Sequence, residues 1–523
     1  MREEIKVAHC IDKELQQLSK DKDLGELHAF TGVAKNGVVK DTLSILERQK
    51  EHSKVVKDLK YAIKKSNIQD GMTISFHHHF RNGDYIVNMV LDEIAQMGVK
   101  NLTIAASSLS EIHEPLIDHI KNGVVRKIET SGLRGPLADA ISNGLMEVPV
   151  VFRSHGGRAS AITRGELKID IAFLGAPSSD AYGNANGYSR ENDNGSCCGS
   201  LGYARPDAQY ADKVIIITDN LVSFPNAPFG IPQYQVDYVV CVDAIGDPSK
   251  IMSGATRVTS NPKELLMAQM TADVVEASGY FNEGFSFQMG SGGASLATVQ
   301  FLREKMIAEN IKASFALGGI TGQIVKLHEE GFVKKILDVQ SFDLVAANSL
   351  KDNRFHQQID AAYYASPDHE GTAVNQLDVV ILSALEIDTK FNVNVLTGSD
   401  GVIRGAIGGH PDTAIGASVS IIVAPLTRGR IPTIVKNINT IVTPGETIDV
   451  LVTDQGVAVN PGRPELKERL EKAGITVCDI EQLQEKVEKI IGKPQSIQYK
   501  EKVVGIVQYR TGEVIDLIRQ VAD

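Results

Sequence analysis

A glycine turn has the residue types and spacing to hold an anion or a polarised carbonyl. It lies in SFQMGSGGASLATVQFL, residues 286–302, which has the pattern of a strand, a turn and a helix. Gly290, Gly292 and Gly293 allow a sharp turn and close approach of the backbone to a ligand. N–H groups at the start of the next helix could stabilise a thioester carbonyl or a tetrahedral oxyanion. The segment lacks the P-loop and dinucleotide patterns, and a tight turn without a ligand is the alternative.

A histidine-rich segment, FHHHFRNGD from Phe76, is the second candidate. In an extended chain His77 and His79 share one side. Together with Arg81 and Asn82 they could bind a carboxylate. A His-x-His pair can also bind zinc or iron, but no third ligand is evident in the sequence. We therefore predict anion binding here and no metal.

Both segments occupy equivalent positions in a duplicated sequence. Ser75-Phe76 aligns with Ser286-Phe287, and three pairs of stretches repeat in the same order at nearly constant spacing, which indicates a duplicated domain. In the second pair, DIAFLGAPSSDAYGNANG and DVVILSALEIDTKFNVNV, the shared Asp and Asn residues favour a structural turn, because Asx side chains bond nearby backbone. These residues are Asp180, Asn184 and Asn186 in one copy and Asp388, Asn392 and Asn394 in the other.

The elements that position these loops follow from short apolar runs separated by helical ones. This alternation predicts an α/β protein with two tandem, duplicated open α/β domains and a cleft between them. We expect a charged leader at residues 1–50, a first domain at 51–260 and a second at 261–523, with a helix starting near Asn261-Pro262. Both candidate loops then follow the carboxyl ends of strands, where open α/β sheets bind ligands.

Composition excludes several classes of partner. The 523 residues carry a net charge of −11 without a concentrated basic stretch, which argues against nucleic acid. No apolar run has the length of a membrane span, and the N-terminus lacks the core of a signal peptide. The five cysteines include no C-x-x-C pair, so we expect a reduced, cytoplasmic chain. The neighbours Cys197 and Cys198 have no evident base to activate a thiolate.

Several motifs together resemble the CoA-transferase superfamily. They are GSGG after a strand, LSALEIDTKFNVNV, GAIGGHPDTAIGASVSIIVAPLTRGRIPTIV and VLVTDQGVAV. The segment SFHHHFRNGDYIVN and the overall length resemble, within it, the citrate lyase alpha chains. The resemblance covers about residues 50 to 515.

The resemblance implies a transferase that exchanges acetyl for citryl on a thioester, so that acetyl thioester and citrate give citryl thioester and acetate. The thioester would sit on a dephospho-CoA-type prosthetic group of a gamma (acyl carrier) chain, with acetyl-CoA as a substitute. A beta (lyase) chain would then cleave the citryl thioester. The chain itself would carry no cofactor and would work in an oligomeric complex.

One segment departs from the superfamily. Many CoA-transferases carry a nucleophilic Glu after the second strand of the second copy, where this chain has FALGGITGQIV with Gly318 and Gly319. We therefore predict a ternary-complex route without an acyl-glutamate. Arg404 joins the His77 to Asn82 group as a candidate for citrate's carboxylates, and Glu386 could orient a substrate group. The alternatives are a covalent transferase or acetyl-CoA hydrolase that uses Glu386, and an assembly scaffold.

Overall fold

The computed structural model describes residues 17, 20, 52–192, 194–252, 259–290, 292–493 and 496–522. The chain forms two compact units, residues 1–53 and 54–523, and every element discussed below belongs to the second. The expected leader lies almost entirely outside the described residues.

The first of two large sheets has the strand order β1-β11-β9-β6-β2-β3-β4-β5-β25-β26. All neighbours are parallel except the final hairpin. The bounds are β1 Val55–Val56, β2 Thr73–Phe76, β3 Leu102–Ala106, β4 Val125–Thr130, β5 Val150–Phe152, β6 Ile171–Gly175, β9 Lys213–Thr218, β11 Tyr238–Cys241, β25 Tyr499–Gln508 and β26 Val514–Val521. Strands such as β6 are buried throughout, as expected when helices cover both faces of a parallel sheet.

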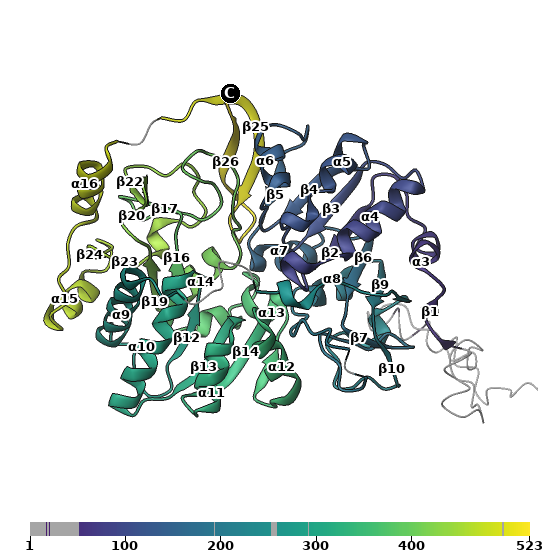
Figure 1. The fold of residues 1–523 in the computed structure, drawn as a ribbon, viewed down its shortest axis with the longest axis horizontal. Coiled ribbons are helices and arrows are strands. Elements are labelled where there is room, and N and C mark those ends of the chain that lie inside the picture. Colours follow the sequence, from purple (N-terminus) through teal and green to yellow (C-terminus); the bar gives the residue numbers. More distant parts are fainter. Residues whose placement is uncertain are drawn as a thin grey trace, which may run out of the picture. The chain divides into compact units, whose positions relative to one another are not determined.

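The second large sheet repeats this arrangement, with the order β15-β14-β13-β12-β16-β19-β23-β24. The bounds are β12 Ser286–Met289, β13 Ala313–Ile320, β14 Val333–Ser341, β15 His356–Gln358, β16 Val379–Ser383, β19 Val419–Val423, β23 Val450–Thr453 and β24 Gly456–Val459. Reading β11-β9-β6-β2-β3-β4-β5 against β23-β19-β16-β12-β13-β14-β15 gives seven matched strands in one spatial order. The duplication read from the sequence is therefore confirmed. We call the parts built on these two sheets the first and the second half, which lie on the right and left of Figure 1.

A small sheet beside each large one carries the repeated Asp/Asn turn. The orders are β10-β7-β8 and β18-β17-β22, with β7 Ser178–Asp180, β8 Ala185–Asn186, β10 Leu221–Val222, β17 Glu386–Asp388, β18 Val393–Asn394 and β22 Ile434–Val435. Asp180 Oδ1 accepts from the backbone N–H of Gly183 and Asn184, and Asp388 Oδ1 accepts from that of Asn392. The structural interpretation of this turn is confirmed.

Helices begin where the sequence gives start signals. Asn261 caps α9 (Pro262–Ala277) by accepting from the N–H of Lys263, with proline at the first helical position. α10 (Gly293–Glu309) follows the glycine turn and ends at Asn310, whose φ is +54°. α9, α10 and α11 (Gly322–Glu329) lie in front of the second sheet in Figure 1. The domain boundary at residues 260 and 261 stays a prediction.

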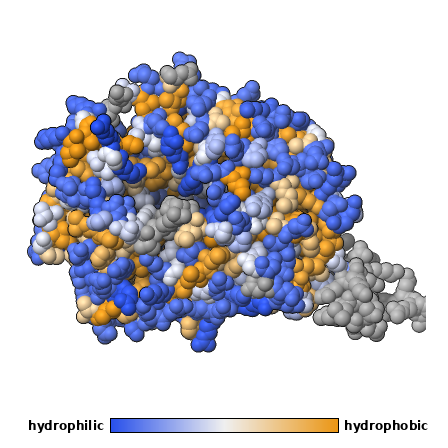
Figure 2. All heavy atoms as spheres, in the orientation of Figure 1, coloured by the Kyte–Doolittle hydropathy of each residue, from blue (hydrophilic) through white to orange (hydrophobic). Residues whose placement is uncertain are grey.

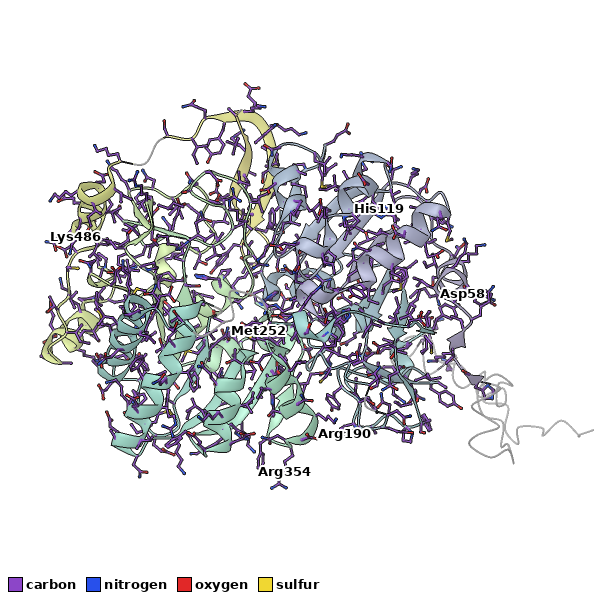
Figure 3. The ribbon with its side chains drawn as sticks, viewed as in Figure 1. Asp58, His119, Arg190, Met252, Arg354 and Lys486 are labelled. Carbon is purple, nitrogen blue, oxygen red and sulfur yellow. The ribbon has the colours of Figure 1, made fainter. Side chains whose placement is uncertain are left out.

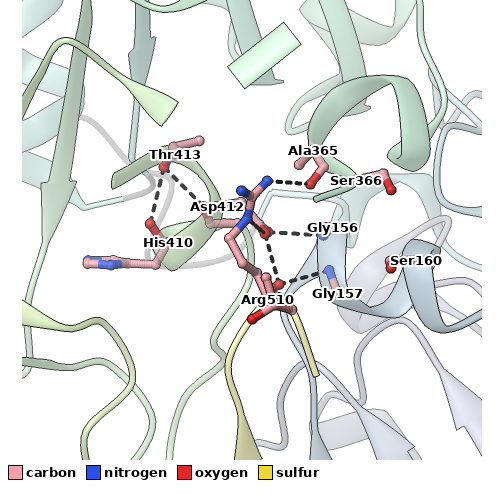
Figure 4. A network of polar contacts seen from close by, with 12 residues as sticks. Gly156, Gly157, Ser160, Ala365, Ser366, His410, Asp412, Thr413 and Arg510 are labelled. Atoms are coloured by element: carbon pink, nitrogen blue, oxygen red, sulfur yellow. Dashed lines mark hydrogen bonds and ion pairs between the residues drawn. The ribbon is translucent and has the colours of Figure 1, made fainter. Parts of the chain in front are cut away.

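A buried polar network joins the two halves and the chain's last hairpin (Figure 4). Asp412, in α14 (His410–Gly416), accepts from the Ser154 hydroxyl at 2.9 Å and from the Gly156 N–H at 3.0 Å. Ser154 caps α7 (His155–Thr163) of the first half. Arg510, between β25 and β26, donates to Asp412 at 3.2 Å and to the carbonyl of Ala365 at 2.8 Å. This network fixes the first-half loop at His155 against the second half.

None of the helices described is both long and apolar enough to cross a membrane.

Candidate active site

A cavity of about 880 Å³ lies where loops from both halves meet. Met252, labelled near the centre of Figure 3, belongs to its lining. The space-filling view has a hollow near the middle of the same face, with mainly hydrophilic residues around it (Figure 2). The lining residues used below are His78, Arg81, Asn82, Arg134, His155 and Tyr203 from the first half, and Gln288, Gly290, Gly292, Gly293, Ser295, Gly319, Gln340, Phe342 and Arg404 from the second.

The glycine turn forms one wall of the cavity and leads into α10. The N–H of Gly290 donates to the carbonyl of Ile381 at 2.6 Å, which holds the turn against β16. Gly292 is the N-cap of α10, and a Cβ at this position would lie 3.0 Å from Cβ and Oγ of Ser383. The first turn of a long helix offers N–H groups without intrahelical partners and a positive dipole end. This wall is therefore suited to a carbonyl oxygen that gains negative charge.

Ser295 adds a side chain to this wall. It is fully buried, lines the cavity in the first turn of α10, and within the described part of the chain its hydroxyl has no hydrogen-bond partner. A buried hydroxyl left without a partner is costly, so a ligand atom in the cavity would relieve that cost.

The loop at Gly318 and Gly319, where the resemblance led us to look for a Glu, packs against other side chains. Gly318 has a φ of +97°, and a Cβ there would lie 2.6 Å from the amide of Gln288. A Cβ at Gly319 would lie 2.1 Å from Cζ of Phe342. Gly319 lines the cavity and Gly318 does not. A side chain at either position would therefore displace Gln288 or Phe342.

The histidine segment presents its middle residue to the cavity. His77 and His79 lie on one side, with ring centroids 5.3 Å apart, but that side faces the protein interior. Nε2 of His77 lies 2.9 Å from the carbonyl of Gly175, and Nε2 of His79 lies 3.1 Å from that of Ile245. Burial, followed by the nearby His79, lowers the pKa of His77 to about 3. Their assignment to citrate stays a prediction, and these contacts do not support it.

His78 instead belongs to an aromatic group on the cavity wall. Its ring stacks on Tyr203 at 5.3 Å, and Tyr203 contacts His155 at 4.2 Å. Nε2 of His78 lies 3.1 Å from Oε1 of Gln340 in the second half. Burial lowers the pKa of His155 to about 3, so this ring is neutral near pH 7.

Two arginines of the first half, Arg81 and Arg134, line the cavity, and their charges interact. Burial, followed by the like charge of Arg134, lowers the pKa of Arg81 to about 10. Burial also lowers the pKa of Arg134, and Glu111 opposes that shift. Both guanidiniums remain charged at neutral pH, and two like charges in a partly desolvated wall favour an anion between them.

The remaining predicted residues lie in different surroundings. Asn82 lines the cavity and accepts from the N–H of Ile112 at 3.3 Å. Arg404 lines it too, but its side chain is half-exposed and pairs with Asp400 and, at 3.8 Å, with Asp139. Their substrate roles, like those of the other candidates, stay predictions.

Glu386 is buried and outside the cavity lining. Oε2 of Glu386 accepts from Asn394 Nδ2 at 2.9 Å, within the small sheet. Burial raises the pKa of this carboxyl. Among the described residues no group of three His, Cys, Asp or Glu side chains could hold a metal ion.

Sequence reasoning missed several lining residues that contribute a ring or a charge. They include Arg134, His155, Tyr203 and Phe342. Arg134, His155 and Phe342 follow the carboxyl ends of β4, β5 and β14, so the rule for ligand sites in open α/β sheets could have found them. Tyr203 had no such signal.

Comparison with known proteins places these features in a family. Residues 52–521 match the family model described as citrate lyase, alpha subunit. The citrate lyase alpha chain of Haemophilus influenzae is 59% identical over 478 residues, which is 91% of this chain and 95% of that one. The chain belongs to the citrate lyase alpha subunit family. The resemblance inferred from the sequence is thus confirmed, as is the expectation of a citrate lyase enzyme subunit.

Solved structures agree with this assignment. The alpha subunit of citrate lyase from Streptococcus mutans, solved in complex with citrate, is 55% identical with a TM-score of 0.88, covering 95% of this chain and 96% of that one. A 4-hydroxybutyrate CoA-transferase from Porphyromonas gingivalis shares the fold, with a TM-score of 0.52 at 16% identity over 85% of this chain and 98% of that one. The predicted CoA-transferase-like α/β fold is therefore confirmed.

Proposed function

We propose that this chain exchanges acetyl for citryl on a thioester, converting acetyl thioester and citrate into citryl thioester and acetate. The observation that carries the proposal is the composition of the cavity. One wall carries the guanidiniums of Arg81 and Arg134, and the opposite half supplies an open glycine turn at the start of α10. The first suits a polycarboxylate and the second suits a thioester carbonyl. The citrate-bound relative supports the choice of acceptor.

The reaction divides between these walls. A citrate carboxylate oxygen attacks the acetyl carbonyl and the C–S bond breaks. The thiolate departs, and acetyl and citryl are joined in a mixed anhydride. The thiolate then attacks the citryl carbonyl of the anhydride, and acetate leaves. In both steps the N–H groups at the start of α10 stabilise the oxyanion, while Arg81 and Arg134 orient the citrate. No protein nucleophile takes part.

Two features argue against an acyl-glutamate: the packing of the loop at Gly318 and Gly319, and the burial of Glu386. Gln288 and Phe342 fill the space beside Gly318 and Gly319, and Glu386 is buried in the small sheet beside Asn394. Initial velocities measured with acetyl-CoA and citrate varied together should give intersecting lines. Labelled CoA should not exchange into acetyl-CoA without a carboxylate acceptor. Parallel lines with acceptor-free exchange would instead establish a covalent route.

The natural thioester would be carried by the dephospho-CoA-type group of a gamma (acyl carrier) chain, and the product would pass to a beta (lyase) chain. A cavity of about 880 Å³ lies at the upper end of the range for small-molecule sites, so an acceptor and the end of a thioester arm could occupy it together. Purified full-length chain should therefore incorporate labelled citrate into thioester from acetyl-CoA alone. Acetate release without citrate would indicate a hydrolase, and the absence of any exchange would favour a scaffold.

A further inference from the structure

Residues at the end of β14, in the second half, contact the first-half wall of the cavity, where we place the citrate acceptor. Gln340 and Phe342 are two residues apart, and both line the cavity. Gln340 lies against His78 at 3.1 Å, and the Arg81 guanidinium lies over the Phe342 ring at 4.8 Å. A guanidinium at this distance from a ring face is attracted by the ring's quadrupole. Side chains of the second half thus contact both His78 and Arg81 in the first-half loop.

The backbone that presents Phe342 is fixed on both sides. Its N–H donates to the carbonyl of Ile320 at 2.8 Å. The next residue, Asp343, accepts from the N–H of Gly322 at 2.7 Å and from that of Ala346 at 2.8 Å. A ring on so constrained a backbone is a rigid support for a flexible arginine.

The Phe342 ring occupies the space that a side chain at position 319 would need. A Cβ there would lie 2.1 Å from Cζ and 2.2 Å from Cε2 of the ring. The pairing of β13 with β14 also shifts register between Gly318 and Gly319, so this strand end is irregular where the ring enters. The Phe342 ring therefore does two things at once: it occupies the space beside Gly319, and it lies under the Arg81 guanidinium.

Arg81 needs such a support. Its φ of +55° lies in the left-handed region that a non-glycine residue adopts at a cost. Its guanidinium also interacts with the like charge of Arg134, and this repulsion opposes holding both arginines beside one anion site. A ring face offers attraction without neutralising the charge that the acceptor requires.

We propose that Phe342 is a positioning residue for citrate: by filling the space beside Gly319 it holds Arg81 toward the acceptor. The inference rests on the proposed function, because it takes citrate as the acceptor.

The test measures citrate affinity by isothermal titration calorimetry on the purified full-length chain. We expect Phe342→Leu to weaken citrate binding about tenfold, while acetyl-CoA binding stays within about twofold. Phe342→Tyr keeps the ring and should remain within about twofold of the unaltered chain. Phe355→Leu is the matched control, since Phe355 also carries an arginine over its ring, at 4.6 Å, but outside the cavity lining.

A double variant tests whether Phe342 acts through Arg81. Phe342→Leu added to Arg81→Met should cause no further loss of citrate affinity, because the supported group is already absent. Additive losses, or unchanged citrate affinity in folded Phe342→Leu, would overturn the inference. If Phe342→Leu does not fold, Phe342→Met replaces it with the same expectation. Binding is measured without turnover, so a chain that binds citrate but exchanges no label would refute the proposed function and leave this result standing.

Discussion

The loops after β2 and β12 occupy equivalent places in the two halves, but they are built in opposite ways. After β2, the His77 and His79 side chains turn inward to core carbonyls. After β12, the glycine turn leaves its backbone and the start of α10 open to the cavity. By contrast, the Asp/Asn turns of the small sheets are alike in both halves. Duplication has kept the turn that folds each half and has altered the loops that meet a ligand.

The largest expected effect comes from closing the open loop. Gly292→Val should lower the exchange rate more than 100-fold, since loss of oxyanion stabilisation costs about 10² to 10³ in rate. The φ of Gly292 is −75°, so the effect is steric: the added carbon meets Ser383 at 3.0 Å. Steady-state label exchange measures it. Gly371→Val is the control, because a Cβ at Gly371 has nothing within 4 Å.

The next largest effect concerns Arg134, in the loop after β4 of the first half. Arg134→Met should raise the citrate KM roughly tenfold to a hundredfold, the cost of one charge-assisted hydrogen bond, with little change in the acetyl-CoA KM. Arg126→Met removes an exposed arginine at the start of β4, away from the cavity lining, and should change neither. An equal rise in the citrate KM and the acetyl-CoA KM would show that Arg134 does not act specifically on citrate.

The buried His77 in the loop after β2 should make the free energy of unfolding sensitive to acid. The pKa of His77 is about 3 in the folded chain and near 6.5 when unfolded, so the unfolded chain binds the extra proton between these values. Stability should fall as pH drops below about 6.5, by up to roughly 1.4 kcal/mol per pH unit for this residue. Urea unfolding at pH 7.5, 6 and 5 should show a shallower slope in His77→Gln. Gly292→Ala should keep the slope of the unaltered chain, and a slope unaffected by His77→Gln would contradict the assignment.

The smallest effect concerns a residue outside both loops. Glu386→Gln should keep exchange activity within about threefold, because an amide oxygen can still accept from Asn394 and the buried carboxyl already has a raised pKa. A folded variant with no exchange, together with a trapped acyl group at Glu386 in the unaltered chain, would instead show a covalent transferase.

The sequence predicted those parts of the site that depend on local pattern. Glycine spacing located the open turn, and repeated Asp and Asn residues located the small-sheet turns. Alternation placed His77 and His79 on one side correctly, but which side faces the core depends on carbonyls at Gly175 and Ile245, far along the chain. Arg134 and Phe342 become site residues only when the sheets bring separate strand ends together. Local propensity contains no information on that closure.

The pairing of β25 with β5 has a consequence for how the molecule is made. The edge of the first sheet is completed by a strand from the end of the chain, and Arg510 beyond it bonds to Asp412 of the second half. During synthesis, β5 emerges from the ribosome long before its neighbour exists and must wait with an open edge. Such edges are sites of misassembly between nascent chains. Residues translated long after β5 are thus the ones that close the first half.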